Sequence, residues 1–131
     1  LIPPLAPLTR QTLDWNGRDT LLLPDHNGRL AVRAAQGSGI RLALWQAARI
    51  SVKYREGGET VQLTARGARR ELKKFLQEQG IPPWIRERLP LIYLDEQLVS
   101  VAGRWVMYPF AACAEDSSVE IRWIGGVSGE G

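Results

Sequence analysis

A short amphipathic helix near the middle of the chain, and the abrupt way it must end, constrain the fold most strongly. Apolar side chains at Leu72, Phe75 and Leu76 follow the i, i+3, i+4 spacing of one helix face. Gly80 suits a left-handed helix end, and residues 82–83 are prolines that fix the backbone after it. The pattern therefore predicts one helix that buries a single stripe and stops at Gly80.

The segments around this helix predict short strands. Residues 50–55 alternate between apolar and polar side chains, which is typical of a half-buried strand. Gly57 and Gly58 favour a hairpin turn, after which residues 60–65 would return beside the first strand. Residues 42–45 fit a strand or a helical turn equally well. Further strands are predicted at residues 20–23, 28–33, 91–94, 98–101, 105–108 and 119–124.

Residues 83–89 predict a second short helix that begins with proline and ends before Pro90. The order of elements predicts an α+β fold, a small, mainly antiparallel sheet with one main helix and a short second helix packed on it. We expect residues 1–48 to be a linker with short strands, residues 49–124 to form the domain, and residues 125–131 to be a flexible tail. A chain of 131 residues with 44% hydrophobic content can bury one ordinary core.

Basic residues gather around the helix and make its outer face positive. Between Arg49 and Arg88 there are ten basic and five acidic residues, whereas after Arg88 the acidic residues outnumber the basic ones. Such a local patch suits contact with phosphates. A solvated amphipathic face is the ordinary alternative for a helix of this kind. Candidate nucleic-acid contacts are the basic side chains of the region, two turn glycines with exposed amides and one tryptophan: Arg55, Gly57, Gly58, Arg69, Arg70, Lys73, Lys74, Trp84, Arg86 and Arg88.

Trp84 has two interpretations. An aromatic ring is a usual stacking platform for unpaired bases, but a tryptophan after two prolines more often packs beneath the turn. Neither a catalytic residue nor a metal site is expected. Glu59 fits a capping or pairing role, Cys113 a buried position and His26 an exposed turn. The absence of a long apolar run excludes a membrane-spanning helix.

The block RELKKFLQEQGIPPWIRERLP, the turn YREGGE and the strand LVSVAGRWV resemble the C-terminal domain of tRNA(Ile)-lysidine synthetase. The resemblance extends over roughly four-fifths of the sequence. It implies an α+β domain that binds the acceptor-stem region of tRNA(Ile). It also implies an N-terminal PP-loop domain that uses ATP, with Mg, to ligate lysine to the wobble cytidine in the cytoplasm.

No Ser-Gly-Gly-x-Asp-Ser phosphate loop occurs here, and the sequence begins at Leu1 without methionine. We therefore expect a non-catalytic part of a longer enzyme, with tRNA(Ile) and its own catalytic domain as partners and no cofactor of its own. The alternative is a protein-interaction or dimerisation module, because Trp15, Trp45 and Trp105 have no evident RNA role and aromatic residues are enriched at interfaces. A homodimer fits either reading. A stand-alone enzyme would need a nucleophile, metal site or phosphate loop.

Overall fold

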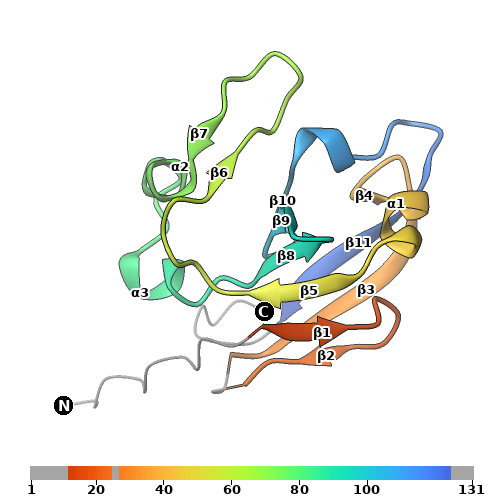
Figure 1. Cartoon of the computed structure of the whole chain (residues 1–131), viewed down its shortest axis with the longest axis horizontal. Coiled ribbons are helices and arrows are strands. Elements are labelled where there is room, and N and C mark those ends of the chain that lie inside the picture. Colours follow the sequence, from red (N-terminus) through yellow and green to blue (C-terminus); the bar gives the residue numbers. More distant parts are fainter. Residues whose placement is uncertain (1–11, 25–26, 125–131) are drawn as a thin grey trace.

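Two antiparallel sheets contain nine of the eleven strands in the described part of the chain (Figure 1). The computed structural model describes residues 12–24 and 27–124. The larger sheet has five strands in the order β1-β5-β8-β9-β10. These strands are β1 (Leu13–Trp15), β5 (Ile50–Lys53), β8 (Leu91–Leu94), β9 (Gln97–Val101) and β10 (Trp105–Val106). In β5, Ile50 and Val52 are buried while Ser51 and Lys53 are half-buried, which confirms the predicted alternation.

The smaller sheet has four strands in the order β2-β3-β11-β4. These strands are β2 (Leu21–Leu22), β3 (Arg29–Gln36), β11 (Ser117–Ile124) and β4 (Ile40–Arg41). Strands β3 and β11 pair along their whole length, from Ser117 opposite Gln36 to Ile124 opposite Arg29. This long ladder joins segments from near the two ends of the described chain.

The inner faces of the two sheets form one hydrophobic core. Helix α1 (Leu42–Ala47) adds Trp45, whose ring meets that of Trp15 edge to face with centroids 5.4 Å apart. The Trp45 indole N–H donates to the Gly17 carbonyl oxygen at 2.9 Å. The segment that fitted strand or helix equally well is therefore a helix, preceded by the short strand β4. Buried members of this core are Trp15, Leu23, Leu30, Ile40, Trp45, Ile50, Val52, Ile92, Leu94, Val99, Val119 and Ile121.

A second, smaller unit stands beside the larger sheet. It consists of strands β6 (Thr60–Val61) and β7 (Arg70–Glu71), which pair with each other, and helices α2 (Leu72–Glu78) and α3 (Pro83–Arg86). In Figure 1 both helices lie on the same side of the molecule, away from β2 and β3. A second cluster of buried residues joins this unit to the sheet: Val61, Leu72, Phe75, Leu76, Leu89, Leu91, Val101, Ala102 and Met107.

Helix α2 ends as its sequence predicts. Gly80 has a φ of 76°, its N–H donates to the Gln77 carbonyl at 3.0 Å, and the Ile81 N–H donates to the Leu76 carbonyl at 3.1 Å. These two bonds form a Schellman motif, which satisfies carbonyls at the helix end. Pro83 then begins α3, so the second predicted helix is also present, although it ends at Arg86.

The predicted hairpin between residues 50–55 and 60–65 is wrong. Strand β5 pairs with β1 and β8, whereas Thr60 and Val61 pair with β7. The reason is visible in the loop between them. The carboxylate of Glu59 accepts the backbone N–H groups of Glu56 at 2.8 Å and Gly57 at 3.0 Å, and Val61 is buried in the second cluster rather than beside β5. Gly57 and Gly58 therefore lie in a loop that carries the chain away from the larger sheet, and they do not form a hairpin turn.

The predicted hairpin at residues 91–101 is present as β8 and β9. Its turn residues Asp95 and Glu96 have φ values of 46° and 71°, as a two-residue hairpin turn requires. The strand predicted at residues 105–108 is shorter, because the 3-10 helix η1 (Tyr108–Phe110) begins where it was expected to end. The strand predicted at residues 119–124 is β11, and the strand predicted at residues 28–33 is β3.

The α+β expectation is confirmed, because the sheets are mainly antiparallel and α2 is the main helix. The boundary predicted after residue 48 does not coincide with a break in packing, since β1 pairs with β5 and β3 pairs with β11 across it. The tail expected at residues 125–131 lies outside the described residues. Within the described ranges, no helix is long and apolar enough to cross a membrane.

Candidate nucleic-acid interface

The two lysines of α2 point away from the core. The helix buries Leu72, Phe75 and Leu76, so the intervening positions Lys73 and Lys74 are exposed. Neither lysine forms an ion pair within the described part of the chain. Both ammonium groups are therefore available to an anionic partner.

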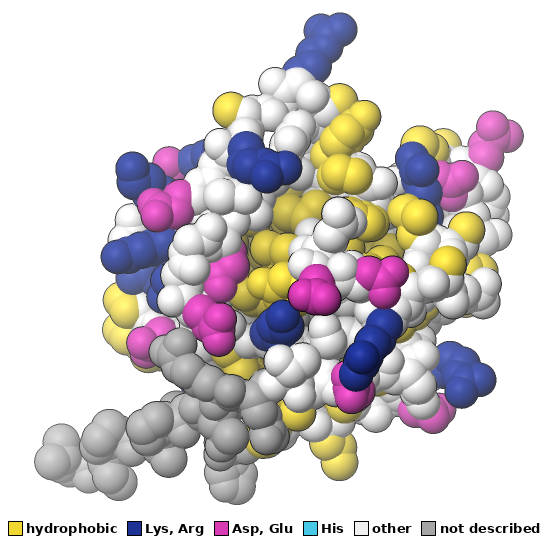
Figure 2. Space-filling view, viewed as in Figure 1, with side chains coloured by type: hydrophobic (Ala, Val, Ile, Leu, Met, Phe, Trp, Pro, Cys, Tyr) yellow, Lys and Arg dark blue, Asp and Glu magenta, His cyan; other side chains and the backbone are white. Residues whose placement is uncertain are grey.

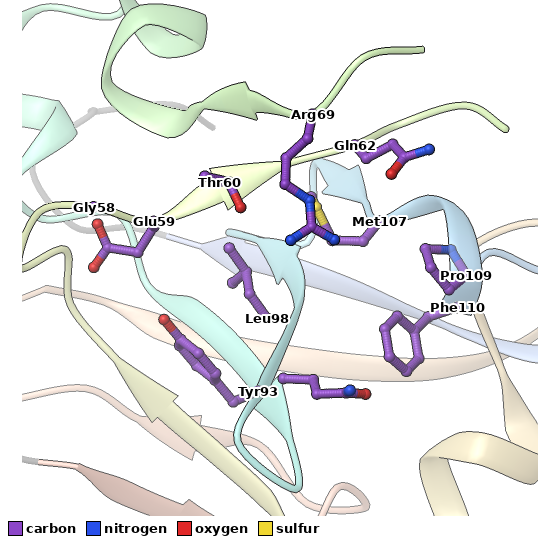
Figure 3. A pocket seen from close by; sticks show the side chains of 11 residues that line it. Gly58, Glu59, Thr60, Gln62, Arg69, Tyr93, Leu98, Met107, Pro109 and Phe110 are labelled. Atoms are coloured by element: carbon purple, nitrogen blue, oxygen red, sulfur yellow. The ribbon is translucent and has the colours of Figure 1, made fainter. Parts of the chain in front are cut away.

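Arg69 and Arg70, expected on the helix, precede it. Arg70 belongs to β7, and its guanidinium forms an ion pair with Glu78 and lies 5.6 Å from the centre of the Phe75 ring. Its charge is thus partly used within the fold. Because successive side chains along an extended backbone alternate between faces, Arg69 points the other way, toward the larger sheet, as Figure 3 shows.

Trp84 is 65% exposed, one of the most exposed large apolar side chains in the structure. The residues of this turn that pack on the second cluster are Ile81 and Ile85. The expectation that Trp84 packs beneath the turn is therefore wrong. Its ring is presented to solvent on the outer side of α3, where an aromatic face can accept a stacking partner.

The last two arginines of the predicted set differ in accessibility. Arg86 is half-buried, and its Nε is a buried atom without a hydrogen bond among the described residues. Arg88 is only 5% exposed, and its Nε donates to Asn27 Oδ1 at 3.1 Å. The Asn27 amide in turn donates to the Arg88 carbonyl at 2.8 Å. Arg88 is consequently part of a buried polar contact and not of the exposed surface.

The predicted contact residues of the glycine loop are also partly buried or already hydrogen-bonded within the fold. Arg55 is half-buried, and Gly57 and Gly58 have φ values of 112° and 85° that favour glycine. The Gly57 N–H already donates to Glu59, so it is not available to a phosphate in this conformation. The capping role expected for Glu59 is confirmed by its two bonds to backbone amides.

We name the exposed surface of α2 and α3 the basic edge and define it by Lys73, Lys74, Trp84 and Arg86. Figure 2 shows Lys and Arg side chains gathered on the side where Figure 1 places these helices, with some carboxylates among them. The carboxylate of Glu78, at the end of α2, is neutralised by Arg70. The basic edge therefore combines unpaired cations with an exposed aromatic ring, a combination that suits a phosphate backbone and an adjacent base.

No group of three or more His, Cys, Asp and Glu side chains in the described ranges could hold a metal ion. Cys113, expected to be buried, is exposed instead, with its Sγ 3.8 Å from an Arg41 guanidinium nitrogen. His26 lies outside the described residues.

One feature that the sequence did not indicate is a hollow between the second unit and the larger sheet. Residues from β6, the segment before β7, β8, β9 and η1 line it, and its volume is about 440 Å³. Burial raises the pKa of the Tyr93 hydroxyl in this hollow above its ordinary value, and the nearby carboxylates of Glu59 and Glu56 raise it further. Lys53 Nζ lies 4.8 Å from the centre of the Tyr93 ring. The lining residues come from distant segments, so no local sequence pattern could reveal them.

Comparison with known proteins identifies a family for this chain. The family model described as TilS substrate C-terminal domain matches residues 50–123. The tRNA(Ile)-lysidine synthase of Methylococcus capsulatus is 36% identical over 125 residues, which cover 94% of this chain and 28% of that protein. The tRNA(Ile)-lysidine synthase of Coxiella burnetii is 38% identical over 104 residues, which cover 79% of this chain and 23% of that protein.

A solved structure described as the crystal structure of the TilS C-terminal domain has a similar fold. Its TM-score is 0.71 at 16% sequence identity, and the match covers 89% of this chain and 98% of that one. The chain spans about a quarter of the length of the curated relatives that it matches. With the family model covering more than half of its residues, the chain belongs to the TilS substrate C-terminal domain family and corresponds to the C-terminal domain of tRNA(Ile)-lysidine synthase.

Proposed function

We propose that this domain binds tRNA(Ile) through the basic edge. The observation that carries the proposal is the exposure of Lys73 and Lys74 on α2 without ion-pair partners in the described chain, next to a helix that presents Trp84. A-form RNA is recognised mainly through its backbone, its 2′-hydroxyls and its shape. Two lysines and an aromatic ring on one edge can make such contacts without reading a sequence.

The domain would position the acceptor-stem region of the tRNA while chemistry takes place elsewhere. A separate N-terminal PP-loop domain would bind ATP with Mg and ligate lysine to the wobble cytidine. This division of labour is supported by the family of the chain and by the name of its relatives, tRNA(Ile)-lysidine synthase. Lys73, Lys74 and Trp84 are the residues we assign to RNA contact, with Arg86 as a partly accessible fourth.

Charge reversal provides the direct test. Fluorescence anisotropy would measure binding of the chain to tRNA(Ile), and to a hairpin that copies its acceptor stem, over a range of salt concentrations. We expect Lys73→Glu, Lys74→Glu to weaken binding to both RNAs and to reduce the slope of log K against log salt by about two, because each lost phosphate contact removes about one unit.

The matched control is the double variant Arg18→Glu, Arg29→Glu. Both arginines are exposed and form no ion pair in the described chain, and Figure 1 places their segments around β1 to β3, away from α2. This control variant changes the net charge by the same amount as Lys73→Glu, Lys74→Glu. An equal loss of RNA affinity in the control would therefore show a non-specific charge effect. Absence of RNA binding by the folded chain would overturn the proposal and favour a module that contacts only protein.

A further inference from the structure

The hollow beside the larger sheet has an apolar floor and one cationic side chain above it. Figure 3 shows Met107 beside the guanidinium of Arg69 and Leu98 below it, with Phe110 to one side and Tyr93 to the other. Each of these side chains except Arg69 is buried or half-buried, so the floor is largely shaped by packing. The complete lining is Gly58, Glu59, Thr60, Gln62, Arg69, Tyr93, Gln97, Leu98, Met107, Pro109 and Phe110.

Arg69 is placed over this floor by the local backbone. Its neighbour Arg70 faces Phe75 and Glu78 on the helix side of β7, so Arg69 projects from the opposite side of the extended segment. Arg69 forms no ion pair in the described ranges. A guanidinium above an apolar floor, without an internal counter-ion, is suited to a ligand that brings its own anionic group.

The walls of the hollow are held by backbone hydrogen bonds. The Tyr108 N–H donates to the Gln62 carbonyl at 2.8 Å, which ties η1 to the segment after β6. The Met107 N–H donates to the Val99 carbonyl at 2.8 Å, which ties the same turn to β9. On the opposite side the Glu59 carboxylate is bonded to two loop amides. The cavity is therefore preformed, as ligand sites usually are.

The chemistry of the walls restricts the ligand. One side carries Arg69, whereas the other carries the carboxylate of Glu59, so the site favours a ligand with a single anionic group at one end. The apolar floor favours a flat, weakly polar body, and the side-chain amide of Gln97 supplies a hydrogen-bond donor and an acceptor at its edge. A volume of about 440 Å³ lies in the range of small-ligand sites.

We propose that the hollow holds one unpaired nucleotide of the bound RNA, with its base on Leu98, Met107 and Phe110 and its phosphate at Arg69. The inference rests on the proposed function, because it assigns a second contact to the same RNA. Sequence-independent recognition of unpaired bases commonly combines a cation for the backbone with a surface on which the base lies. The basic edge would hold the double-stranded part, and the hollow would hold the single strand that continues from it.

Two hairpin RNAs that differ only at one end test the inference. One has a blunt stem, and the other carries a single-stranded 3′ extension on the same stem. We expect the chain to bind the extended RNA roughly 5- to 150-fold more tightly, which is the effect of one stacked base. Arg69→Ala and, separately, Phe110→Ala should remove this preference while leaving the affinity for the blunt stem unchanged.

Arg66→Ala is the matched control, since Arg66 is an exposed arginine of the same segment and does not line the hollow. It should retain the preference. Because Phe110 packs against both cores, circular dichroism would verify that Phe110→Ala is folded. If Phe110→Ala is unfolded, the result for Arg69→Ala alone decides the test. A 2-aminopurine base at the unpaired position should also change its fluorescence on binding, and Arg69→Ala should abolish that change.

The outcomes separate this inference from the proposed function. Equal affinity for the two RNAs, or a preference that survives Arg69→Ala, overturns the hollow as a nucleotide site while RNA binding through the basic edge stands. Lys73→Glu, Lys74→Glu should weaken binding to both RNAs equally, because these lysines contact the stem. Failure of the folded chain to bind either RNA overturns both proposals.

Discussion

Arg88 donates from Nε to Oδ1 of Asn27 at 3.1 Å, and both side chains are buried. The bond joins the segment after α3 to the turn between β2 and β3, which are far apart in the sequence. A second bond runs back from the Asn27 amide to the Arg88 carbonyl at 2.8 Å, and the Trp123 indole donates to the Asn27 carbonyl at 2.7 Å. Asn27 thus connects the smaller sheet to the helical unit.

Loss of this side chain should destabilise the fold. Asn27→Ala removes an acceptor from the buried Arg88 guanidinium and a donor from the Arg88 carbonyl, and losing hydrogen bonds to buried groups costs roughly 1–3 kcal/mol each. We expect the free energy of unfolding, measured in urea, to fall by about 2 kcal/mol or more. Gln77→Ala on the exposed face of α2 is the control and should cost much less. A fall under about 0.5 kcal/mol for Asn27→Ala would contradict a structural role for the contact.

Two glycines with nearly the same backbone conformation should respond differently to alanine. Gly103 and Gly80 have φ values of 74° and 76°, so both substitutions carry the conformational cost of about 1–2 kcal/mol. A Cβ at Gly80 meets nothing within 4 Å, but at Gly103 it would collide with the Ile121 carbonyl oxygen and lie 2.7 Å from the carbonyl carbon. We expect Gly103→Ala to lower the melting temperature clearly more than Gly80→Ala. Equal effects would show that β11 can move away without cost.

The elements that the sequence predicts correctly are those defined by neighbouring residues. The stripe of Leu72, Phe75 and Leu76 together with Gly80 defines α2, and the alternation from Ile50 defines β5. The β8–β9 hairpin follows equally from two apolar runs around a short turn. In each case the information lies within one or two turns or strands, so no knowledge of distant contacts is needed.

The errors concern long-range partners. The sequence shows two glycines after β5 but does not show that Glu59 holds their loop, or that Val61 joins the second core. Arg88 reads as a surface cation, because its buried partner Asn27 is 61 residues away. Likewise, Arg70 is removed from the free basic surface by Glu78, a pairing that depends on the turn from β7 into α2. Local charge patterns therefore overestimate the available binding surface.

The hydroxyl of Tyr93 should titrate above its ordinary pKa of 10.0, chiefly because it is desolvated by burial and also because Glu59 and Glu56 are near. A raised pKa means that the folded state holds the phenolic proton more tightly than the unfolded state. The resulting stability is complete below pH 10 and is lost as pH rises from there through the raised folded-state value.

The measurement is the alkaline titration of phenolate absorbance, with Tyr93→Phe used to identify the contribution of this residue. Glu59→Gln should lower the pKa of Tyr93 but leave it above the ordinary value, because burial remains the larger cause. Ionisation of Tyr93 at or below its ordinary pKa of 10.0 would contradict the described burial of its hydroxyl.

The thiol of Cys113 should react readily in the folded protein. Cys113 is exposed, in contrast to the expectation from its residue type, because it lies in the loop between η1 and β11. We expect Ellman's reagent to modify it in the native state at a rate close to that in denaturant, since access and not unfolding limits the reaction. Protection by more than about tenfold in the native state would indicate a buried thiol.

Trp84 should contribute to RNA binding without contributing to stability. Its side chain is 65% exposed, and the packing of α3 depends on Ile81 and Ile85, so Trp84→Ala should change the free energy of unfolding by less than about 0.5 kcal/mol. A base stacked on the ring would be worth roughly 1–3 kcal/mol, so affinity for tRNA(Ile) should fall about 5- to 150-fold. Leu22→Ala removes an apolar side chain that is 76% exposed on β2 and should leave affinity unchanged. If Trp84→Ala and Leu22→Ala bind RNA equally well, the ring is not a stacking platform, and the basic edge would act through its lysines alone.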